Sequence, residues 1–145
     1  MHIRKMTLED LDAATEIEKA NFSNPWTKEG FESELKADNT LYLICESEGK
    51  PVGLCGYIRS FEEADVTNVS VLREYRGQGI ATALMKELLR LGTDDGISDF
   101  SLEVRVGNAD AIHVYEKLGF VSEGIRPNFY DNPKEDAMIM WRRNR

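Results

Sequence analysis

A turn containing two glycines, placed between a strand-like run and an amphipathic helix, constrains the fold of this chain most strongly. Residues 64–71 form the strand-like run, and apolar side chains at helical spacing follow Gly79. Gly77 and Gly79 allow backbone conformations, and a close approach of a ligand, that a residue with a Cβ atom resists. The first N–H groups of the following helix have no partner within it, and its positive dipole end attracts anions. The turn is therefore a candidate pyrophosphate site.

Two common phosphate-binding motifs do not describe this turn. A P-loop ends in Gly-Lys-Ser/Thr, whereas Gly79 is followed by Ile80 and Ala81. The spacing Gly77-x-Gly79-x-x-Thr82 comes close to the dinucleotide fingerprint, but that fingerprint normally follows the first strand of alternating βαβ units, and here it lies mid-chain. Taken alone, the pattern also fits an ordinary strand-to-helix turn.

Hydrophobic spacing and turn residues predict alternating strands and helices along the whole chain. Strands are expected at residues 2–6, 41–46, 52–58, 64–71, 98–106, 120–125 and 136–141. Helices are expected from Thr7 to about Asn21, from Thr27 past Leu35, from Gly79 to Gly92 and from Asn108 to Leu118. In the first of these helices, Leu8 is expected on the apolar face. This order predicts an α/β fold in which helices cover both faces of a mixed sheet. We expect one domain over residues 1–145, because no repeat or linker-like stretch divides them.

Composition bears on the cellular location of the protein, on the state of its cysteines and on metal binding. The chain has no apolar run suited to a signal peptide or to a membrane span, so we expect a cytoplasmic protein without membrane contact. Cys45 and Cys55 fall on neighbouring strands of a predicted hairpin, and in a reducing compartment we expect buried thiols. His2 and His113 stand apart from other ligand-type residues, so we expect no metal.

The net charge of −8 argues against unaided binding to nucleic acid and suits a basic partner. The oligomeric state does not follow from the sequence, and a monomer or weak dimer is expected.

Several motifs together resemble a known family. Arg76-x-x-Gly79-x-Ala81 is similar to the acetyl-coenzyme A signature of the GCN5-related N-acetyltransferases (GNAT), Gln/Arg-x-x-Gly-x-Gly/Ala. Further segments resemble the bacterial RimI branch of that family: Asn24-Pro25-Trp26, Asn68-Val69-Ser70-Val71, Leu102-Glu103-Val104-Arg105, Asn108-Ala109, Tyr115-Glu116-Lys117-Leu118-Gly119-Phe120 and Glu135-Asp136-Ala137-Met138-Ile139-Met140. The resemblance implies a GNAT fold, a mixed central sheet that splays between its fourth and fifth strands. It also implies transfer of acetyl from acetyl-CoA to the N-terminal alanine of a basic small-subunit ribosomal protein.

The resemblance also implies a set of coenzyme contacts. The turn residues Arg76, Gly77, Gln78, Gly79, Ile80, Ala81 and Thr82 are expected at the pyrophosphate, the backbone of Val69, Ser70 and Val71 along the pantetheine arm, and Asn108 nearby. From the residues alone, the two valines are strand core and Asn108 is a helix N-cap. Both roles are compatible for Asn108.

Two residues are candidates for proton transfer. Glu103 lies on a strand where Leu102, Val104 and Val106 are expected to face one way and the polar residues the other. It matches the RimI general base, although a strand glutamate near Arg105 also fits an ordinary solvated pair. Tyr115 matches the general acid, and by spacing alone it also fits a core aromatic residue.

Three aromatic residues are expected to line the acceptor groove: Trp26, Phe129 and Tyr130. They also fit simple packing at the domain edge, and Phe129 stands where the branch often has a tyrosine. Two other functions stay open. One is acetylation of a different amine, such as a lysine, a polyamine or a small metabolite, and the other is a non-catalytic acetyl-CoA-binding module.

Overall fold

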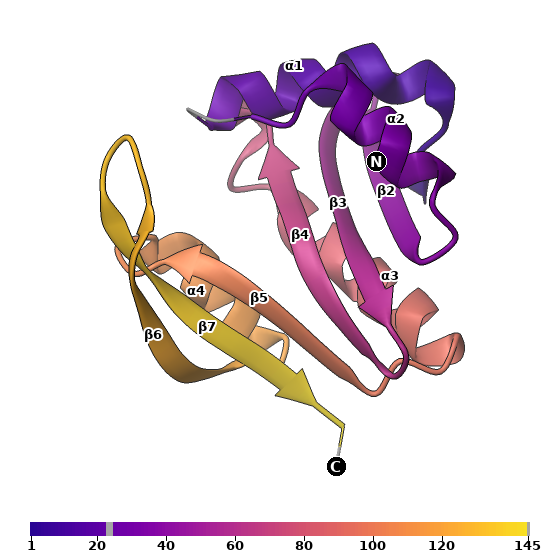
Figure 1. The fold of residues 1–145 in the computed structure, drawn as a ribbon. Helices are drawn as coiled ribbons and strands as arrows, with labels where there is room; N and C mark the ends of the chain where they lie inside the picture. The colour runs from indigo at the N-terminus through magenta and orange to yellow at the C-terminus, as the bar shows by residue number, and fades with distance from the viewer. Residues whose placement is uncertain (23–24, 145) are drawn as a thin grey trace.

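The computed structural model describes residues 1–22 and 25–144 (Figure 1). In chain order the elements are β1 (His2–Lys5), the 3₁₀ turn η1 (Leu8–Asp10), α1 (Leu11–Asn21), α2 (Lys28–Lys36), β2 (Thr40–Ser47), β3 (Lys50–Ser60), β4 (Glu63–Val71), the 3₁₀ turn η2 (Arg73–Tyr75), α3 (Ile80–Asp94), β5 (Asp99–Arg105), α4 (Ala109–Lys117), β6 (Val121–Tyr130) and β7 (Glu135–Arg143). The predicted order of strands and helices is confirmed. None of the described helices is long and apolar enough to span a lipid bilayer.

The strands form one mixed sheet that opens in the middle. Its order is β1-β2-β3-β4-β5-β7-β6, and β4 with β5 is its parallel pair. These two strands pair from Glu63 opposite Asp99 to Asp65 opposite Ser101 and then diverge. Figure 1 shows the gap widening toward the end of β4 that lies near α1. The predicted splay between the fourth and fifth strands is confirmed, and it leaves one edge of β4 open to a ligand.

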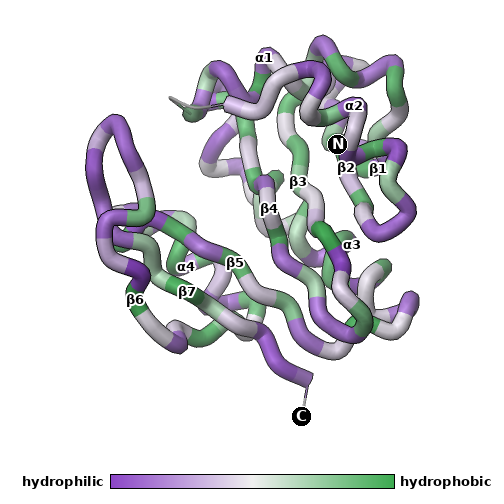
Figure 2. Tube along the Cα trace, viewed as in Figure 1, coloured by the Kyte–Doolittle hydropathy of each residue, from purple (hydrophilic) through white to green (hydrophobic). Residues whose placement is uncertain are grey.

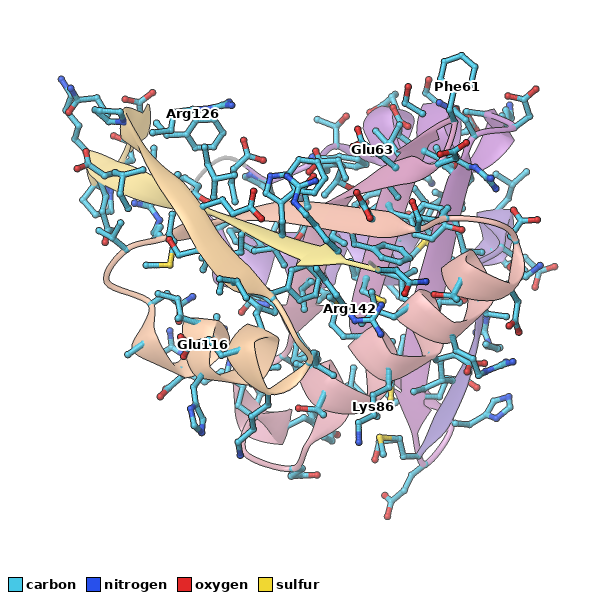
Figure 3. The ribbon with its side chains drawn as sticks, turned by 90° about the horizontal axis from the view of Figure 1, so that it is seen from below. Phe61, Glu63, Lys86, Glu116, Arg126 and Arg142 are labelled. Atoms are coloured by element: carbon cyan, nitrogen blue, oxygen red, sulfur yellow. The ribbon has the colours of Figure 1, made fainter. Side chains whose placement is uncertain are left out.

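Helices cover both faces of the sheet, as predicted. Helices α1 and α2 lie on one face and α3 with α4 on the other, where Figure 3 places Lys86 and Glu116 on the same side. The larger core lies under α3, whose Leu84 and Leu88 are fully buried. Truncating either leucine to alanine should cost about 2–5 kcal/mol of folding free energy. In Figure 2 the loop joining β6 to β7 is mostly polar, whereas apolar residues recur along the strands.

Two helix boundaries differ from the prediction for local reasons. Leu8 lies in η1 and is 51% exposed, because the α-helix starts only at Leu11. Helix α3 continues past Gly92 to Asp94. A Cβ atom on Gly92 would lie 2.8 Å from Phe100 Cζ, so this glycine serves close packing of α3 on the sheet and does not end the helix. The expected cap of α2 is present, since Thr27 Oγ1 accepts a hydrogen bond of 3.0 Å from the Gly30 N–H.

The two cysteines are buried free thiols, as predicted. The hairpin of β2 and β3 places Cys55 opposite Leu43 and Cys45 opposite Gly53. Burial raises the pKa of both thiols, which keeps them protonated near neutral pH. This environment favours a packing role over a reactive one.

Candidate active site

The glycine turn has the backbone shape that its sequence requires. Gly77 and Gly79 both have a φ of 79°, in the left-handed region where a residue with a Cβ atom is strained. A Cβ built on either one would meet no protein atom within 4 Å, so the glycines serve the backbone conformation and leave the space above the turn open. Gly79 precedes Ile80, the first residue of α3, and the first N–H groups of this helix therefore face that open space without intrahelical partners.

A hollow of 670 Å³ lies over this turn. It is lined by Asn21, Phe22, Val69, Ser70, Val71, Tyr75, Arg76, Gly77, Gly79, Ile80, Ala81, Thr82, Asn108, Asp110, Ala111, Val114 and Tyr115. It thus brings together all the residues expected at the coenzyme except Gln78, which is not part of the lining. The edge of β4 beyond Asp65, which does not pair with β5, and the open space above Gly77 and Gly79 are suited to an extended arm ending in a pyrophosphate.

The side chain of Arg76 lines this hollow and also makes hydrogen bonds to the end of β4 and to α1. Its Nε donates to the carbonyl of Val71 at 3.3 Å, and its guanidinium also donates to Asn21 Oδ1. The Asn21 amide in turn donates to Ser70 Oγ and, at 3.0 Å, to the Val71 carbonyl. Arg76 and Asn21 therefore brace the end of β4 against α1 and the turn. No sequence pattern points to Asn21, which is simply the last residue of a helix.

A second hollow of 550 Å³ opens on the other side of the same gap. Its walls come from α1, the segment before α2, β4, β5, α4, the end of β6 and the loop between β6 and β7, and they include Trp26, Glu103, Phe129 and Tyr130. Asn21, Phe22, Val69, Asn108 and Tyr115 line both hollows. The two spaces therefore meet at the splay, with the expected coenzyme residues on one side and the expected acceptor residues on the other.

Glu103 faces the second hollow from β5. Residues of this strand alternate between buried and partly exposed, as predicted, although Val106 lies beyond the strand and is 39% exposed. Glu103 Oε2 accepts a hydrogen bond of 3.2 Å from Arg126, while Arg105 pairs with Glu135 and not with Glu103. Burial, with a smaller effect of the Asp65 charge, raises the pKa of Glu103, and Arg126 acts in the opposite direction. A raised pKa makes this carboxylate a better proton acceptor.

Tyr115 projects from α4 toward the point where the hollows meet. The residue is 8% exposed, and its ring centroid lies 6.0 Å from that of Phe120. Burial raises the pKa of its phenol, so the hydroxyl keeps its proton near neutral pH. From spacing alone, Tyr115 fits either a core residue or a residue of the site. In the structure it is buried and also lines both hollows.

The remaining predicted residues occupy mixed positions. Asn108 caps α4, since its Oδ1 accepts a hydrogen bond of 3.2 Å from the Ala111 N–H, and it also lines both hollows. Trp26 lines the second hollow but packs on Phe31, with ring centroids 5.2 Å apart. Asn24, part of the same motif, falls outside the described residues.

Two aromatic residues that line the second hollow each lie next to an arginine, and of the two arginines Arg105 also lines the hollow. Phe129 and Tyr130 make an edge-to-face contact with ring centroids 5.0 Å apart. The Arg105 guanidinium lies 4.4 Å from the Tyr130 ring centroid, and that of Arg126 lies 5.4 Å from the Phe129 centroid. Figure 3 shows Arg126 on one side of the molecule and Glu63 with Phe61 on the other.

A buried polar pair on the floor of the second hollow was not expected from the sequence. Glu18 of α1 and Asn68 of β4 are 2% and 5% exposed, and Asn68 Nδ2 donates to Glu18 Oε1 at 2.6 Å. Burial raises the pKa of Glu18, against the opposing effects of Asn68 and Ser70. The sequence offers one signal for the burial of Glu18: this residue follows Ile17 on the apolar face of α1, where side chains are expected to be buried.

Comparison with known proteins identifies the class to which this fold and site belong. Residues 11–120 match the Acetyltransferase (GNAT) family, and the chain belongs to that family. It is therefore an N-acetyltransferase, a class of enzyme that uses acetyl-CoA.

Within the family, the chain is similar to several individual proteins. A Bacillus subtilis (strain 168) protein, whose name assigns it provisionally as a [ribosomal protein bS18]-alanine N-acetyltransferase, is 40% identical over 96% of this chain and 93% of its own length. The [ribosomal protein bS18]-alanine N-acetyltransferase of Escherichia coli (strain K12) is 34% identical over 95% of this chain and 94% of its own. The crystal structure of the Escherichia coli ribosomal-protein-S18-alanine N-acetyltransferase superposes with a TM-score of 0.91 at 32% identity, covering 99% of this chain and 93% of that one.

Proposed function

We propose that this protein transfers the acetyl group of acetyl-CoA to the N-terminal alanine of a small-subunit ribosomal protein. The observation that carries the proposal is the meeting of the two hollows at the splay, where Glu103 and Tyr115 approach from different elements. The names of the relatives with 34–40% identity support the choice of acceptor. The net charge of −8 suits a basic partner that arrives by diffusion.

The coenzyme occupies the first hollow in this proposal. The backbone of Val69 to Val71 runs beside the pantetheine arm, and the turn with the start of α3 holds the pyrophosphate. Asn108 contacts the arm while it caps α4. Arg76 contributes by bracing the end of β4, and Gln78, outside the lining, contributes least.

The acceptor enters through the second hollow, past Trp26, Phe129 and Tyr130. An α-amino group with a pKa near 8 is neutral in roughly one molecule in ten at pH 7, whereas a lysine is neutral in fewer than about one in a thousand. A base of modest strength therefore suffices for an N-terminus. Glu103, with its raised pKa, takes the proton directly or through water as the amine attacks.

Transfer then proceeds without an acetyl-enzyme. The amine nitrogen forms a bond to the thioester carbonyl carbon, the carbon–sulfur bond breaks, and the departing thiolate receives the proton of the Tyr115 hydroxyl. The products are the acetylated N-terminus and coenzyme A, with Glu103 protonated and Tyr115 deprotonated until solvent restores both. Cys45 and Cys55 are buried in the core and take no part.

The test uses one peptide with two competing amines. The purified protein is incubated with acetyl-CoA and a basic peptide that begins with alanine and contains an internal lysine, and fragmentation mass spectrometry locates the acetyl group. We expect it on the α-amine. Acetyl on the lysine, or transfer only to polyamines or small metabolites, would contradict the proposed acceptor, and coenzyme binding without any transfer would contradict catalysis.

A further inference from the structure

Two carboxylates near α1 are buried, and they differ in how their oxygens are hydrogen-bonded. Asp10 is 6% exposed and receives two hydrogen bonds from Arg4, at 2.7 and 2.9 Å, and one from the Thr7 N–H at 2.8 Å. Glu18 is 2% exposed, and its Oε2 has no hydrogen-bond partner among residues 1–22 and 25–144. A structural carboxylate is expected to resemble Asp10, because a buried oxygen without a partner is costly.

The position of Glu18 is fixed by a chain of hydrogen bonds. Asn68 Nδ2 donates to Glu18 Oε1 at 2.6 Å, and the Thr67 hydroxyl donates to Asn68 Oδ1 at 2.6 Å. The single hydrogen of Thr67 is thereby used, so the Tyr42 hydroxyl, 3.1 Å away, donates to Thr67 Oγ1. In each of these three hydrogen bonds, the donor is therefore the group farther from Glu18 along the chain of bonds, and the last donor, Asn68, points its N–H at Glu18. The nearby Ser70 hydroxyl also favours the charged form of Glu18, but it makes no hydrogen bond of ordinary length and angle to Oε2, so this oxygen stays available.

Glu18 also lies where the proposed acceptor enters. It lines the second hollow together with Asn68, Val69 and Glu103, and Asn21, one turn further along α1, reaches the end of β4. The acceptor's terminal nitrogen is a cation in most molecules at neutral pH, with three N–H donors. The leftover oxygen and this group complement each other in charge and in hydrogen bonding.

We propose that Glu18 binds the α-ammonium group of the acceptor on the floor of the second hollow, an inference that rests on the proposed function. Oε2 is closed to water in the free protein, so the contact requires side chains that line the second hollow to move aside while Oε1 keeps its hydrogen bond from Asn68. Glu18 then holds the ammonium group until it loses one proton to solvent, and Glu103 takes the second proton as the neutral amine attacks. An acceptor without an N-terminal charge loses this contact.

The test is a double-mutant cycle between Glu18 and the acceptor's amine. Binding of two peptides is measured by calorimetry in the presence of coenzyme A: one begins with alanine, and its twin begins with a propionyl group and so lacks the amine. Wild-type protein is compared with Glu18→Gln, which keeps an oxygen for Asn68 but removes the charge. We expect removal of the amine to weaken binding to wild-type roughly ten-fold or more, and binding to Glu18→Gln by less than about three-fold.

Controls separate the possible failures. Thermal unfolding should show that Glu18→Gln is folded; if it is not, Glu18→Asp, which keeps the charge but shortens its reach, should show the same loss of coupling. Glu103→Gln should retain the amine dependence of wild-type binding. Equal losses in wild-type and Glu18→Gln, in a protein that does acetylate the peptide, would overturn the role of Glu18 alone. Failure of wild-type protein to acetylate the alanine peptide would overturn the proposed function, and this inference with it.

Discussion

The two hollows that meet at the splay are built in different ways. The first hollow, which we propose for the coenzyme, is lined by two segments close in sequence, the end of β4 and the turn with the start of α3, together with the end of α1 and one side of α4. The second hollow, which we propose for the acceptor, is lined by residues of α1, β4, β5, α4, the end of β6 and the loop after it, segments that are far apart in the sequence. A pyrophosphate is the same in every molecule of the coenzyme, so one backbone shape suffices for it. Recognition of one amine needs particular side chains, which only the folded chain brings together.

The largest expected effect that tests the separate roles of the two hollows comes from replacing the proposed general base, Glu103. Glu103→Gln should lower kcat by roughly 10²–10⁴-fold while the affinity for coenzyme A stays the same, because the change removes a proton acceptor from the second hollow alone. Steady-state kinetics and calorimetry measure the two effects. Glu116→Gln, on the exposed face of α4, is the matched control and should match wild-type. Unchanged kcat in Glu103→Gln would remove Glu103 from the mechanism.

The acid lies on the boundary between the hollows and should show the next largest effect. Tyr115→Phe should slow transfer roughly 10²-fold by withholding the proton from the leaving thiolate. Tyr57→Phe is the control, since Tyr57 is also a buried tyrosine, at 4% exposure, but lines neither hollow. Wild-type rates for Tyr115→Phe across the pH range would be incompatible with its role as acid.

A pair of glycines separates backbone strain from coenzyme binding. Gly79 and Gly49 have φ values of 79° and 77°, and neither has an atom within 4 Å of a built Cβ. Alanine at either position should cost about 1–2 kcal/mol of folding free energy. Only Gly79→Ala should also weaken coenzyme binding, roughly ten-fold, by altering the turn. Equal coenzyme affinity in the two variants, measured by calorimetry beside thermal unfolding, would show that the turn does not hold the ligand.

The smallest predicted effect is a shift in the pH dependence of transfer. Burial and Asp65 raise the pKa of Glu103, and Arg126 lowers it. Arg126→Ala removes the lowering influence, so the pKa should rise further and the base should become protonated at a higher pH. The acidic limb of kcat/KM should therefore move to higher pH in this variant. A limb that stays in place, or moves to lower pH, would mean that another group controls it.

Much of the fold was predictable because its signals are local. The order of elements followed from periodicity and turn residues, and the strained backbone at Gly77 and Gly79 followed from residue type. The alternation of apolar and polar residues along β5 was enough to place Glu103 on the partly exposed face. The splay itself was expected from the resemblance to the family and not from any pattern in β4 or β5.

The missed features all depend on contacts between distant residues. Glu18 meets Asn68 across 50 positions, and Arg126 meets Glu103 across 23. Arg76 belongs to a recognisable motif, yet its side chain lies on Asn21 because α1 ends beside the turn. The periodicity of residues within one segment cannot predict contacts between residues that are so far apart in the sequence. Ten of the seventeen residues that line the first hollow thus belong to the stretches expected at the coenzyme, whereas Glu18 in the lining of the second hollow was not expected; the roles of all these residues stay predictions.

The most direct test of the two-hollow account is a crystal structure with a bisubstrate analogue, in which an acetyl bridge joins the sulfur of coenzyme A to the α-nitrogen of an alanine peptide. The account predicts that the pyrophosphate lies over residues 76–82, the bridge passes between β4 and β5 next to Tyr115, and the peptide leaves past Glu103 and Tyr130. A peptide that leaves by any other route, with Glu103 facing only solvent, would contradict it.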